Sequence, residues 1–343
     1  MPTPAFLIFV PGIMGTELWD VDGTMVWGGE LDAIIQTLCF RPRALYRASL
    51  KPGRVIDSIK SRALPDLHVY RGILGQIREL GYDSRSFVAF GYDWRKSNAV
   101  SASKLAGFMR AKMENGTERF IIAAHSMGGL VTRLMLRDED LAQRVERYVQ
   151  IATPVRGSSR AYATLKRGPE IHALFDRCRE MLTHLHPGTL HDLLESLSAC
   201  SSLFELLPPA GTRFLEKPAG QWADAFTEDV WPPQLEREIE HAKSLHDSFQ
   251  AVPTCPHTTI FSTGVMSTPY SYSVDNSYNI VSDHPGTNGD GTVTWGSASC
   301  GCETASQVEI GEPIRHDQIP NAASVLAMLV SRGWLQTALR GAG

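Results

Sequence analysis

One short stretch constrains the fold of this chain more than any other. Residues 121–129 read Ile-Ile-Ala-Ala-His-Ser-Met-Gly-Gly, an apolar run that leads into a serine flanked by small residues. Small residues at 124 and 128 allow a strand to turn sharply into a helix with the serine at the apex, where larger side chains would collide. The stretch therefore predicts a strand–turn–helix unit that presents Ser126 at the end of a sheet.

Strand and helix patterns alternate on both sides of this unit. Short apolar runs that stop at turn residues predict buried strands at 5–10, 86–90, 119–124, 145–152 and 258–263. Helical spacing predicts helices at 70–80, 101–113, 129–136 and 319–329. This alternation predicts an α/β fold, with a mostly parallel central sheet and helices on both faces.

The alternation is interrupted between residues 159 and 250. Helical spacing predominates there, at 170–185, 189–197 and 235–249, and two Pro-Pro pairs punctuate it. We therefore expect residues 1–158 to form the first part of the sheet domain, 159–250 an inserted helical cap, and 251–343 the second part. Residues 27–58 are a candidate lid element, with a surface helix and loop as the alternative.

Composition excludes several classes of protein. The net charge of −4 and the pI of about 6.3 argue against a nucleic-acid-binding protein. No apolar run is long enough to span a bilayer, and the run at 5–10 is too short and lacks the basic start of a signal peptide, so we expect a cytoplasmic protein. Cys300 and Cys302 are the only close pair among six cysteines, with no further ligands at metal-site spacing. We expect free thiols, no metal and no cofactor.

Ser126 is the candidate nucleophile. The surrounding pattern is that of a nucleophile elbow, Gly-x-Ser-x-Gly, with Ala124 in the place of the first glycine. Helix N-termini favour developing negative charge, so the N–H of Met127 is expected to donate to an oxyanion. A second donor is expected at Ile13, between glycines in Val-Pro-Gly-Ile-Met-Gly-Thr at 10–16. The alternative for the elbow is a glycine-rich turn with an incidental serine. The alternative for residues 10–16 is a plain turn after the first strand.

A serine hydroxyl needs a base, usually a histidine that a carboxylate orients. His316 is the candidate base, because it follows the other motifs late in the chain and directly precedes the last helix; His284 is its rival. Asp290, in the turn Asn-Gly-Asp-Gly-Thr-Val at 288–293, is the candidate acid. Asp283 and Asp317 are the alternatives for that role.

In their order, these motifs resemble the lecithin:cholesterol acyltransferase family, which includes lysosomal phospholipase A2 and phospholipid:diacylglycerol acyltransferase. The resemblance rests on residues 10–18, 91–95 (Gly-Tyr-Asp-Trp-Arg), 124–129, 153–158, 204–208 and 289–293. It implies an α/β-hydrolase fold with a cap and a mobile lid over an acyl pocket. It also implies a Ser126–Asp290–His316 triad, backbone donors at Ile13 and Met127, and a lipid or other acyl ester as substrate.

The expected function is that of a serine acyl hydrolase, phospholipase- or esterase-like, that works through an acyl-enzyme. The alternatives are an acyltransferase with an alcohol or amine acceptor, and a catalytically silent module that binds a partner. Residues 203–207, Trp222, Phe226 and Trp231 in the cap are candidates for peripheral contact with a membrane or for an acyl channel, and otherwise pack the cap. Asp93 and Arg95 are expected to form a buried charge pair with a structural role.

Overall fold

A six-stranded parallel sheet forms the centre of the molecule. The computed structural model describes residues 5–46, 49–62, 65–169 and 187–335. All strand pairings in the central sheet are parallel, and the order is β15 (Gln307–Ile310), β12 (His257–Ser262), β9 (Val145–Ile151), β8 (Phe120–His125), β1 (Phe6–Val10) and β7 (Phe87–Ala89). The predicted parallel sheet is confirmed, and β15 is the strand that the sequence patterns did not reveal.

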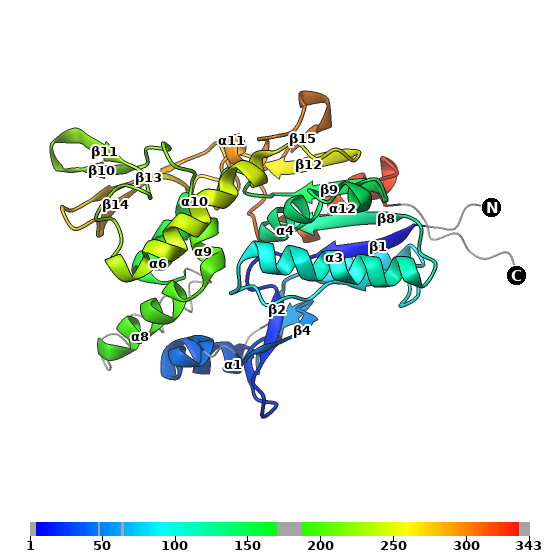
Figure 1. Cartoon of the computed structure of the whole chain (residues 1–343), viewed down its shortest axis with the longest axis horizontal. Helices are drawn as coiled ribbons and strands as arrows, with labels where there is room; N and C mark the ends of the chain where they lie inside the picture. The colour runs from blue at the N-terminus through cyan, green and yellow to red at the C-terminus, as the bar shows by residue number, and fades with distance from the viewer. Residues whose placement is uncertain (1–4, 47–48, 63–64, 170–186, 336–343) are drawn as a thin grey trace, which may run out of the picture.

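Helices cover both faces of this sheet (Figure 1). Successive side chains of a strand point to opposite faces. Phe6, Ile8 and Val10 accordingly join one core cluster, whereas Leu7 and Phe9 join the other. The first cluster includes buried residues of α3 (Asn98–Glu114) and α4 (Met127–Met135), and the second includes those of α2 (Arg71–Glu79) and α12 (Ala323–Ser331). The continuous apolar runs in the sequence thus reflect strands that are buried on both faces.

A second part of the molecule, which we call the cap, lies beyond one end of the central sheet (Figure 1). It contains the helices α6 (Ser159–Arg167), α8 (Pro187–Ser198), α9 (Ser201–Glu205) and α10 (Glu236–Gln250). It also contains a four-stranded sheet in the order β11 (Gln221–Ala223), β10 (Leu215–Lys217), β13 (Thr268–Val274) and β14 (Ile280–Gly286). The helix expected at 170–185 lies outside the described residues.

The cap therefore differs from the purely helical insertion expected at 159–250. Two of its strands, β10 and β11, come from that range, but β13 and β14 come from 251–343, the range assigned to the second part of the sheet domain. β10 and β11 are only three residues long, and β14 is exposed along most of its length. Such strands show neither an apolar run nor regular alternation, which is why the sequence pattern did not predict them.

The candidate lid element, residues 27–58, folds as short helices beside a small sheet. Its helices are α1 (Leu31–Ile35), a π-helix at Gln36–Phe40 and a 3₁₀-helix at Pro42–Tyr46. In the small sheet, β2 (Thr16–Trp19) pairs with both β4 (Lys51–Val55) and β3 (Met25–Trp27). Ile34, Leu38 and Leu45 are buried in the core. The remaining short elements are β5 (Ser58–Ile59), β6 (Leu67–His68), α5 (Glu139–Ala142), α11 (Trp295–Ala298) and 3₁₀-helices at Pro218–Gly220, Pro233–Leu235, Thr304–Ser306 and Ile319–Asn321.

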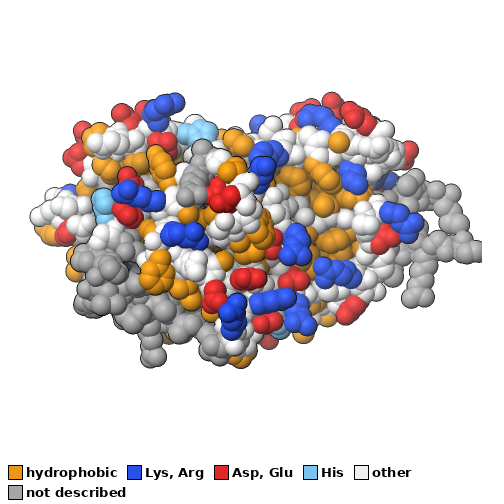
Figure 2. Space-filling view, turned by 90° about the horizontal axis from the view of Figure 1, so that it is seen from below, with side chains coloured by type: hydrophobic (Ala, Val, Ile, Leu, Met, Phe, Trp, Pro, Cys, Tyr) orange, Lys and Arg blue, Asp and Glu red, His pale blue; other side chains and the backbone are white. Residues whose placement is uncertain are grey.

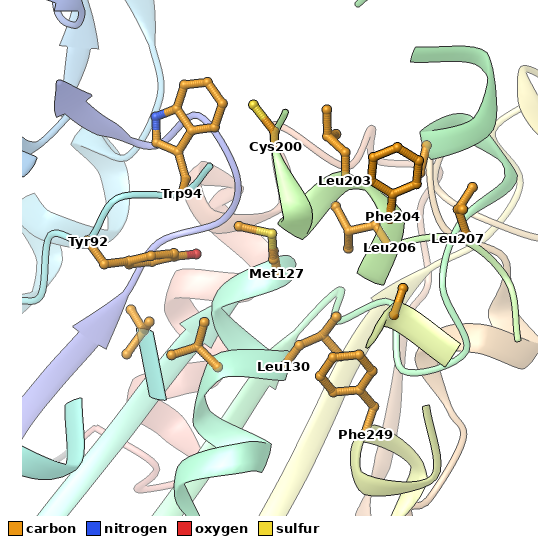
Figure 3. Close-up of a cluster of buried hydrophobic side chains, with 14 of the residues drawn as sticks. Tyr92, Trp94, Met127, Leu130, Cys200, Leu203, Phe204, Leu206, Leu207 and Phe249 are labelled. Carbon is orange, nitrogen blue, oxygen red and sulfur yellow. The ribbon is translucent and has the colours of Figure 1, made fainter. Parts of the chain in front are cut away.

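A shared cluster of buried side chains joins the cap to the sheet domain (Figure 3). Trp94 from the loop after β7 and Met127 of α4 lie in it with Leu203 and Phe204 of α9 and Phe249 of α10. Burial of a large apolar side chain contributes about 1.5–3 kcal/mol. Leu203, Phe204, Leu206 and Leu207 are all buried, so these residues pack the cap rather than face a membrane, and Leu203 and Leu206 also line the cleft described below.

Candidate active site

Ser126 occupies a strained turn between β8 and α4. Its φ of 52° and ψ of −128° lie outside the regions that non-glycine residues ordinarily adopt, and its N–H donates to the Ile151 carbonyl at 2.9 Å. The following helix turn approaches the end of β1 closely. A Cβ on Gly128 would lie 2.4 Å from Pro11 O and 2.5 Å from Val10 O, so only glycine fits there. The expected elbow is present, and its small residues are needed for close backbone contact.

This close contact predicts a large effect of Gly128→Ala. We expect a loss of about 1–3 kcal/mol in the free energy of unfolding, because the added methyl group must displace the backbone of β1 or α4. The displacement also moves Ser126, so kcat should fall. Gly107 in α3 is the matched control, since a Cβ there meets no atom within 4 Å. Gly107→Ala should raise the free energy of unfolding by about 0.5–1 kcal/mol. Urea unfolding of both variants measures the two changes. Equal changes in the two variants would contradict the prediction.

The structure brings the three candidate triad residues together, although they are far apart in the sequence. His316 Nε2 lies 2.8 Å from Ser126 Oγ, and His316 Nδ1 lies 2.7 Å from Asp290 Oδ2. The backbone N–H of His316 also donates to the Asp290 carbonyl at 2.9 Å. The serine is mostly buried, and the aspartate is fully buried. This is the hydrogen-bond order by which a histidine takes a proton from serine while a carboxylate holds its tautomer.

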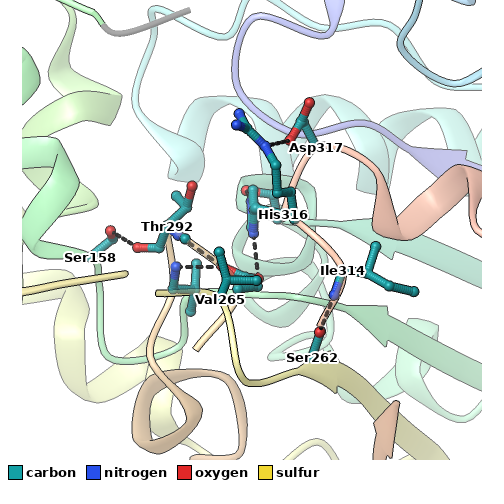
Figure 4. A network of polar contacts seen from close by, with 12 residues as sticks. Ser158, Ser262, Val265, Thr292, Ile314, His316 and Asp317 are labelled. Atoms are coloured by element: carbon teal, nitrogen blue, oxygen red, sulfur yellow. Dashed lines mark hydrogen bonds and ion pairs between the residues drawn. The ribbon is translucent and has the colours of Figure 1, made fainter. Parts of the chain in front are cut away.

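The turn after β14 fixes the Asp290 carboxylate. Its Oδ1 accepts the N–H groups of Thr292 at 3.0 Å and Val293 at 2.7 Å, which leaves Oδ2 for His316. Gly291 supports this turn with a φ of 89°. Figure 4 shows His316 close to the turn at Thr292 and to Asp317. The loop that carries His316 is anchored through Ile314, whose N–H donates to Ser262 Oγ at 2.8 Å.

The alternative candidates lie elsewhere or have other contacts. His284 is exposed on β14 and bonds Ser273 Oγ at 2.7 Å. Asp283, also on β14, forms an ion pair with Arg167 at 2.7 Å. Asp317 lines the same cleft as His316 but pairs with Arg315. Of the two candidate bases, the geometry therefore joins His316 and not His284 to Ser126. Of the three candidate acids, it joins Asp290 to His316.

The loop that carries Ile13 runs beside Ser126. A Cβ on Gly12 would lie 2.9 Å from Ser126 Cβ, so the loop touches the serine. Aromatic side chains hold the loop at three points, each at 2.8 Å: Tyr92 Oη donates to Pro11 O, Gly12 N donates to Tyr70 Oη, and Trp27 Nε1 donates to Met14 O. Met127 is the first residue of α4, where an N–H has no acceptor within the helix.

Sequence reasoning missed the role of Tyr70 and His125 in this site. His125 directly precedes Ser126 in the elbow. It bonds Tyr70 Oη at 2.9 Å through Nδ1 and the His316 carbonyl at 3.1 Å through Nε2. Burial, with a smaller contribution from His316, holds the pKa of His125 well below its ordinary value. Only the position of His125 beside Ser126 signalled this role, since nothing near Tyr70 in the sequence indicates it.

His316 combines burial with two nearby carboxylates. Burial, the largest single influence, lowers its pKa, but the charge and hydrogen bond of Asp290 and the charge of Asp317 together outweigh it. The pKa of His316 therefore lies above its ordinary value of 6.5. Burial raises the pKa of Asp317, but the hydrogen bond from Gln318 and the charge of Arg315 more than offset this, so that pKa is lowered.

The charge of Asp317 leads to a prediction of how activity depends on pH. His316 accepts a proton only in its neutral form, so activity should rise as the pH rises through the His316 pKa. Asp317→Asn removes a charge that raises this pKa, so we expect the acidic limb of the kcat/KM profile to move to lower pH. Initial rates across a pH series measure the shift. Asp283→Asn is the control and should leave the limb in place; an unmoved limb in Asp317→Asn would contradict the assignment.

Ser126 and His316 open into a cleft of about 310 Å³ between the sheet domain and the cap. One group of its lining residues is apolar and consists of Ile13, Met14, Trp27, Ile59, Leu203 and Leu206. A second group is polar or charged and includes His68, His125, Ser158, Arg160, Thr292, Arg315 and Asp317. A cleft of this kind can bind an apolar chain while it accommodates a polar group near the serine.

Within the described ranges, no group of three or more His, Cys, Asp or Glu side chains is placed to hold a metal ion. Cys200, Cys255, Cys300 and Cys302 carry free thiols. No helix in the described part of the chain has the length and apolar character needed to cross a membrane.

The parallel sheet, the strained serine between β8 and α4, and the cap over the sheet define this chain as an α/β hydrolase. A family model of lecithin:cholesterol acyltransferase matches residues 54–241, which is more than half of the chain. The chain belongs to this family, and the resemblance noted from its motifs is confirmed.

Two known proteins illustrate the relationship. Phospholipid:diacylglycerol acyltransferase 1 of Arabidopsis thaliana is 27% identical over 153 residues, an alignment that covers 36% of this chain and 22% of that protein. This chain thus matches only about a fifth of that relative's length. A chain in the crystal structure of the Tle4–Tli4 complex superposes with a TM-score of 0.68 at 16% identity and covers 95% of this chain and 97% of its own length. That similarity shows a common fold.

Proposed function

We propose that this protein is a serine acyl hydrolase that cleaves a lipid or other acyl ester. One observation carries the proposal: Ser126 Oγ, the His316 imidazole and the Asp290 carboxylate form a hydrogen-bonded series, at 2.8 and 2.7 Å, on the wall of a cleft with an apolar side. Family membership supports an ester as the substrate. No step of this chemistry requires a metal or an organic cofactor.

The proposed reaction has two halves. Ser126 Oγ gives its proton to His316 Nε2 and attacks the ester carbonyl carbon, and the carbonyl oxygen becomes negative. The backbone N–H groups of Ile13 and Met127 stabilise this oxyanion. His316 then passes the proton to the leaving alcohol, and an acyl-enzyme remains. Water attacks the acyl-enzyme, gives a proton to His316 and releases the acid, after which His316 returns the proton to Ser126.

Acyl transfer is the second candidate function. The phospholipid:diacylglycerol acyltransferase named above is an acyltransferase by name, and both functions share the acyl-enzyme. They differ only in whether water or an alcohol or amine takes the acyl group. An acceptor such as a long-chain alcohol, added to the assay, separates them, because transfer produces a new ester at the expense of free acid.

The test combines active-site labelling with product release. Native protein and Ser126→Ala are treated with a fluorophosphonate probe, and acyl release is measured on short-chain esters, long-chain esters and phospholipid vesicles. Ser273→Ala is a matched control, since Ser273 Oγ on β13 also lies 2.7 Å from a histidine, His284, which is exposed on β14. We expect labelling and activity to disappear only in Ser126→Ala. Labelled Ser126→Ala would overturn the proposal, and an unreactive native protein would favour the silent binding module.

We also propose peripheral contact with a lipid surface through the cap and the lid element. Figure 2 shows apolar side chains among Lys, Arg, Asp and Glu on the lower face of Figure 1, where α1 and α8 lie. Phe40 and Tyr46 of the lid element are 63% and 64% exposed, and Trp222 of the cap is 44% exposed. Exposed aromatic side chains favour insertion at the headgroup boundary of a lipid surface.

Co-sedimentation with phospholipid vesicles tests this contact. Phe40→Ser combined with Tyr46→Ser should reduce the bound fraction several-fold, whereas Val330→Ser on α12, in the sheet domain, should not change it. Equal binding of both variants would reject a contact through the lid element.

We further propose that the protein acts in the cytoplasm. The free thiols of Cys200, Cys255, Cys300 and Cys302 are consistent with a reducing compartment. Fractionation of cells that express the full-length protein tests this location, which recovery outside the cytoplasm would contradict.

A further inference from the structure

A hydrogen-bonded connection links the two halves of the candidate site behind Ser126. The N–H of Gly12 donates to Tyr70 Oη at 2.8 Å, and Tyr70 Oη lies 2.9 Å from His125 Nδ1. His125 Nε2 lies 3.1 Å from the carbonyl oxygen of His316. The connection thus runs from the loop that carries Ile13, through two side chains, to the backbone of the histidine that contacts Ser126.

The hydrogens in this connection have one consistent arrangement. Tyr70 Oη accepts from Gly12, so its own hydrogen is available to His125 Nδ1, which accepts it. The Nε2 of His125 then carries the ring hydrogen and donates it to the His316 carbonyl. Only a neutral imidazole offers an acceptor and a donor on opposite sides of one ring. Burial raises the pKa of Tyr70 above its ordinary range, so its hydroxyl keeps its hydrogen.

The packing makes this connection rigid. Tyr70 and His125 are 3% and 5% exposed, and their rings meet edge to face with centroids 5.6 Å apart. The ring centroids of His125 and His316 lie 4.9 Å apart. A Cβ on Gly12 would lie 3.3 Å from both His125 Nδ1 and Tyr70 Oη, so the backbone of the loop lies directly on the pair.

His316 is thereby held at both sides of its backbone. Its N–H donates to the Asp290 carbonyl at 2.9 Å, and its carbonyl accepts from His125. These two bonds leave the His316 side chain little freedom to leave hydrogen-bonding distance of Ser126. A misplacement of about 1 Å in a catalytic group can reduce a rate by about 10²-fold.

We propose that His125 is a positioning residue that sets the place of His316 relative to Ser126 and, through Tyr70, the place of the loop that carries Ile13. The inference rests on the proposed function, because it assigns to His125 the support of that same reaction. His125 transfers no proton to the substrate. Its neighbour His316 becomes positively charged during the reaction, and a neutral His125 adds no repulsion to that charge.

The first experiment replaces the ring without its nitrogens. His125→Phe should lower kcat by about 10²-fold and change KM less than twofold, because the substrate cleft remains while the His316 carbonyl loses its donor. The rate of fluorophosphonate labelling of Ser126 should fall in parallel. His246→Phe is the matched control, since His246 is equally buried on α10, between Phe226 and Phe249, and it should leave kcat unchanged.

Two further variants separate the two bonds. His125→Gln places an amide near the position of Nε2 and can still donate to the His316 carbonyl, whereas His125→Asn reaches only the position of Nδ1 beside Tyr70. We expect the glutamine variant to recover most of the activity and the asparagine variant to remain at least tenfold lower in kcat. This comparison also decides the matter if His125→Phe does not fold.

The possible outcomes distinguish this inference from the proposed function. A folded His125→Phe variant with native kcat would overturn the positioning role, and so would equal kcat in the glutamine and asparagine variants. Labelling of Ser126 in these variants would show that the hydrolase assignment still holds. Labelling and activity that persist in Ser126→Ala would instead overturn the proposed function itself. A rise in KM alone would also reject positioning, because it would assign His125 to substrate binding.

Discussion

We expect Asp290→Asn to lower kcat by about 10⁴-fold, the loss that the same change causes in a serine protease triad. The local structure explains why. Oδ1 of Asp290 accepts two backbone N–H groups, from Thr292 and Val293, so an asparagine would keep its oxygen there. Its NH₂ group would then face His316 Nδ1 in place of Oδ2. Nδ1 would have to accept, the ring hydrogen would move to Nε2, and Nε2 could no longer take the proton of Ser126.

Single-turnover and steady-state rates measure this loss, and thermal unfolding shows that the fold is retained. Asp283→Asn serves as the control, because Asp283 pairs with Arg167 on the surface of β14. Its kcat should stay within about twofold of the native value. An Asp290→Asn enzyme that keeps kcat within tenfold would show that Asp290 does not hold the tautomer of His316.

The central sheet and the elbow could be predicted because local sequence determines them. Strands buried on both faces are apolar throughout, so β1, β8, β9 and β12 stood out and their expected bounds agree with the structure within two residues. The elbow needs small residues at fixed offsets from Ser126, and Gly128 shows why, since its close contacts are with the backbone of β1. His316 and Asp290 could be proposed from their order in the chain and their turns.

The rest of the site depends on contacts between segments that are distant in sequence. Tyr70 directly precedes α2, Trp27 ends β3 and Tyr92 follows β7, yet all three bond the same loop after β1. No spacing in the sequence encodes such convergence. The cap sheet is similar, because β10 gains its place by pairing with β13, which follows more than forty residues later. Three-residue strands have no pattern of their own, so tertiary pairing decides their structure.

The segment at 91–95 shows how burial changes the value of an ion pair. Asp93 and Arg95 are each 4% exposed and form two hydrogen bonds. Arg95 Nε donates to Asp93 Oδ1 at 2.8 Å, and Arg95 Nη2 donates to Asp93 Oδ2 at 2.7 Å. Arg95 also donates to the Leu45 carbonyl of the lid element at 2.6 Å, and Ser202 Oγ of α9 donates to the Trp94 carbonyl at 2.5 Å. The structural role expected from the sequence agrees with these contacts, which join the lid element and the cap to the sheet domain.

We therefore expect Asp93→Asn to lower the free energy of unfolding by about 3–5 kcal/mol, because it leaves the buried guanidinium charge without its carboxylate. Asp83 and Arg85 provide a matched control in the same chain. They have the same spacing and similar bonds, at 3.0 and 2.8 Å, but Arg85 is 90% exposed. Water already solvates that pair, so Asp83→Asn should cause no measurable change. Urea unfolding of both variants tests the contrast; equal losses would show that burial does not determine the contribution of this pair.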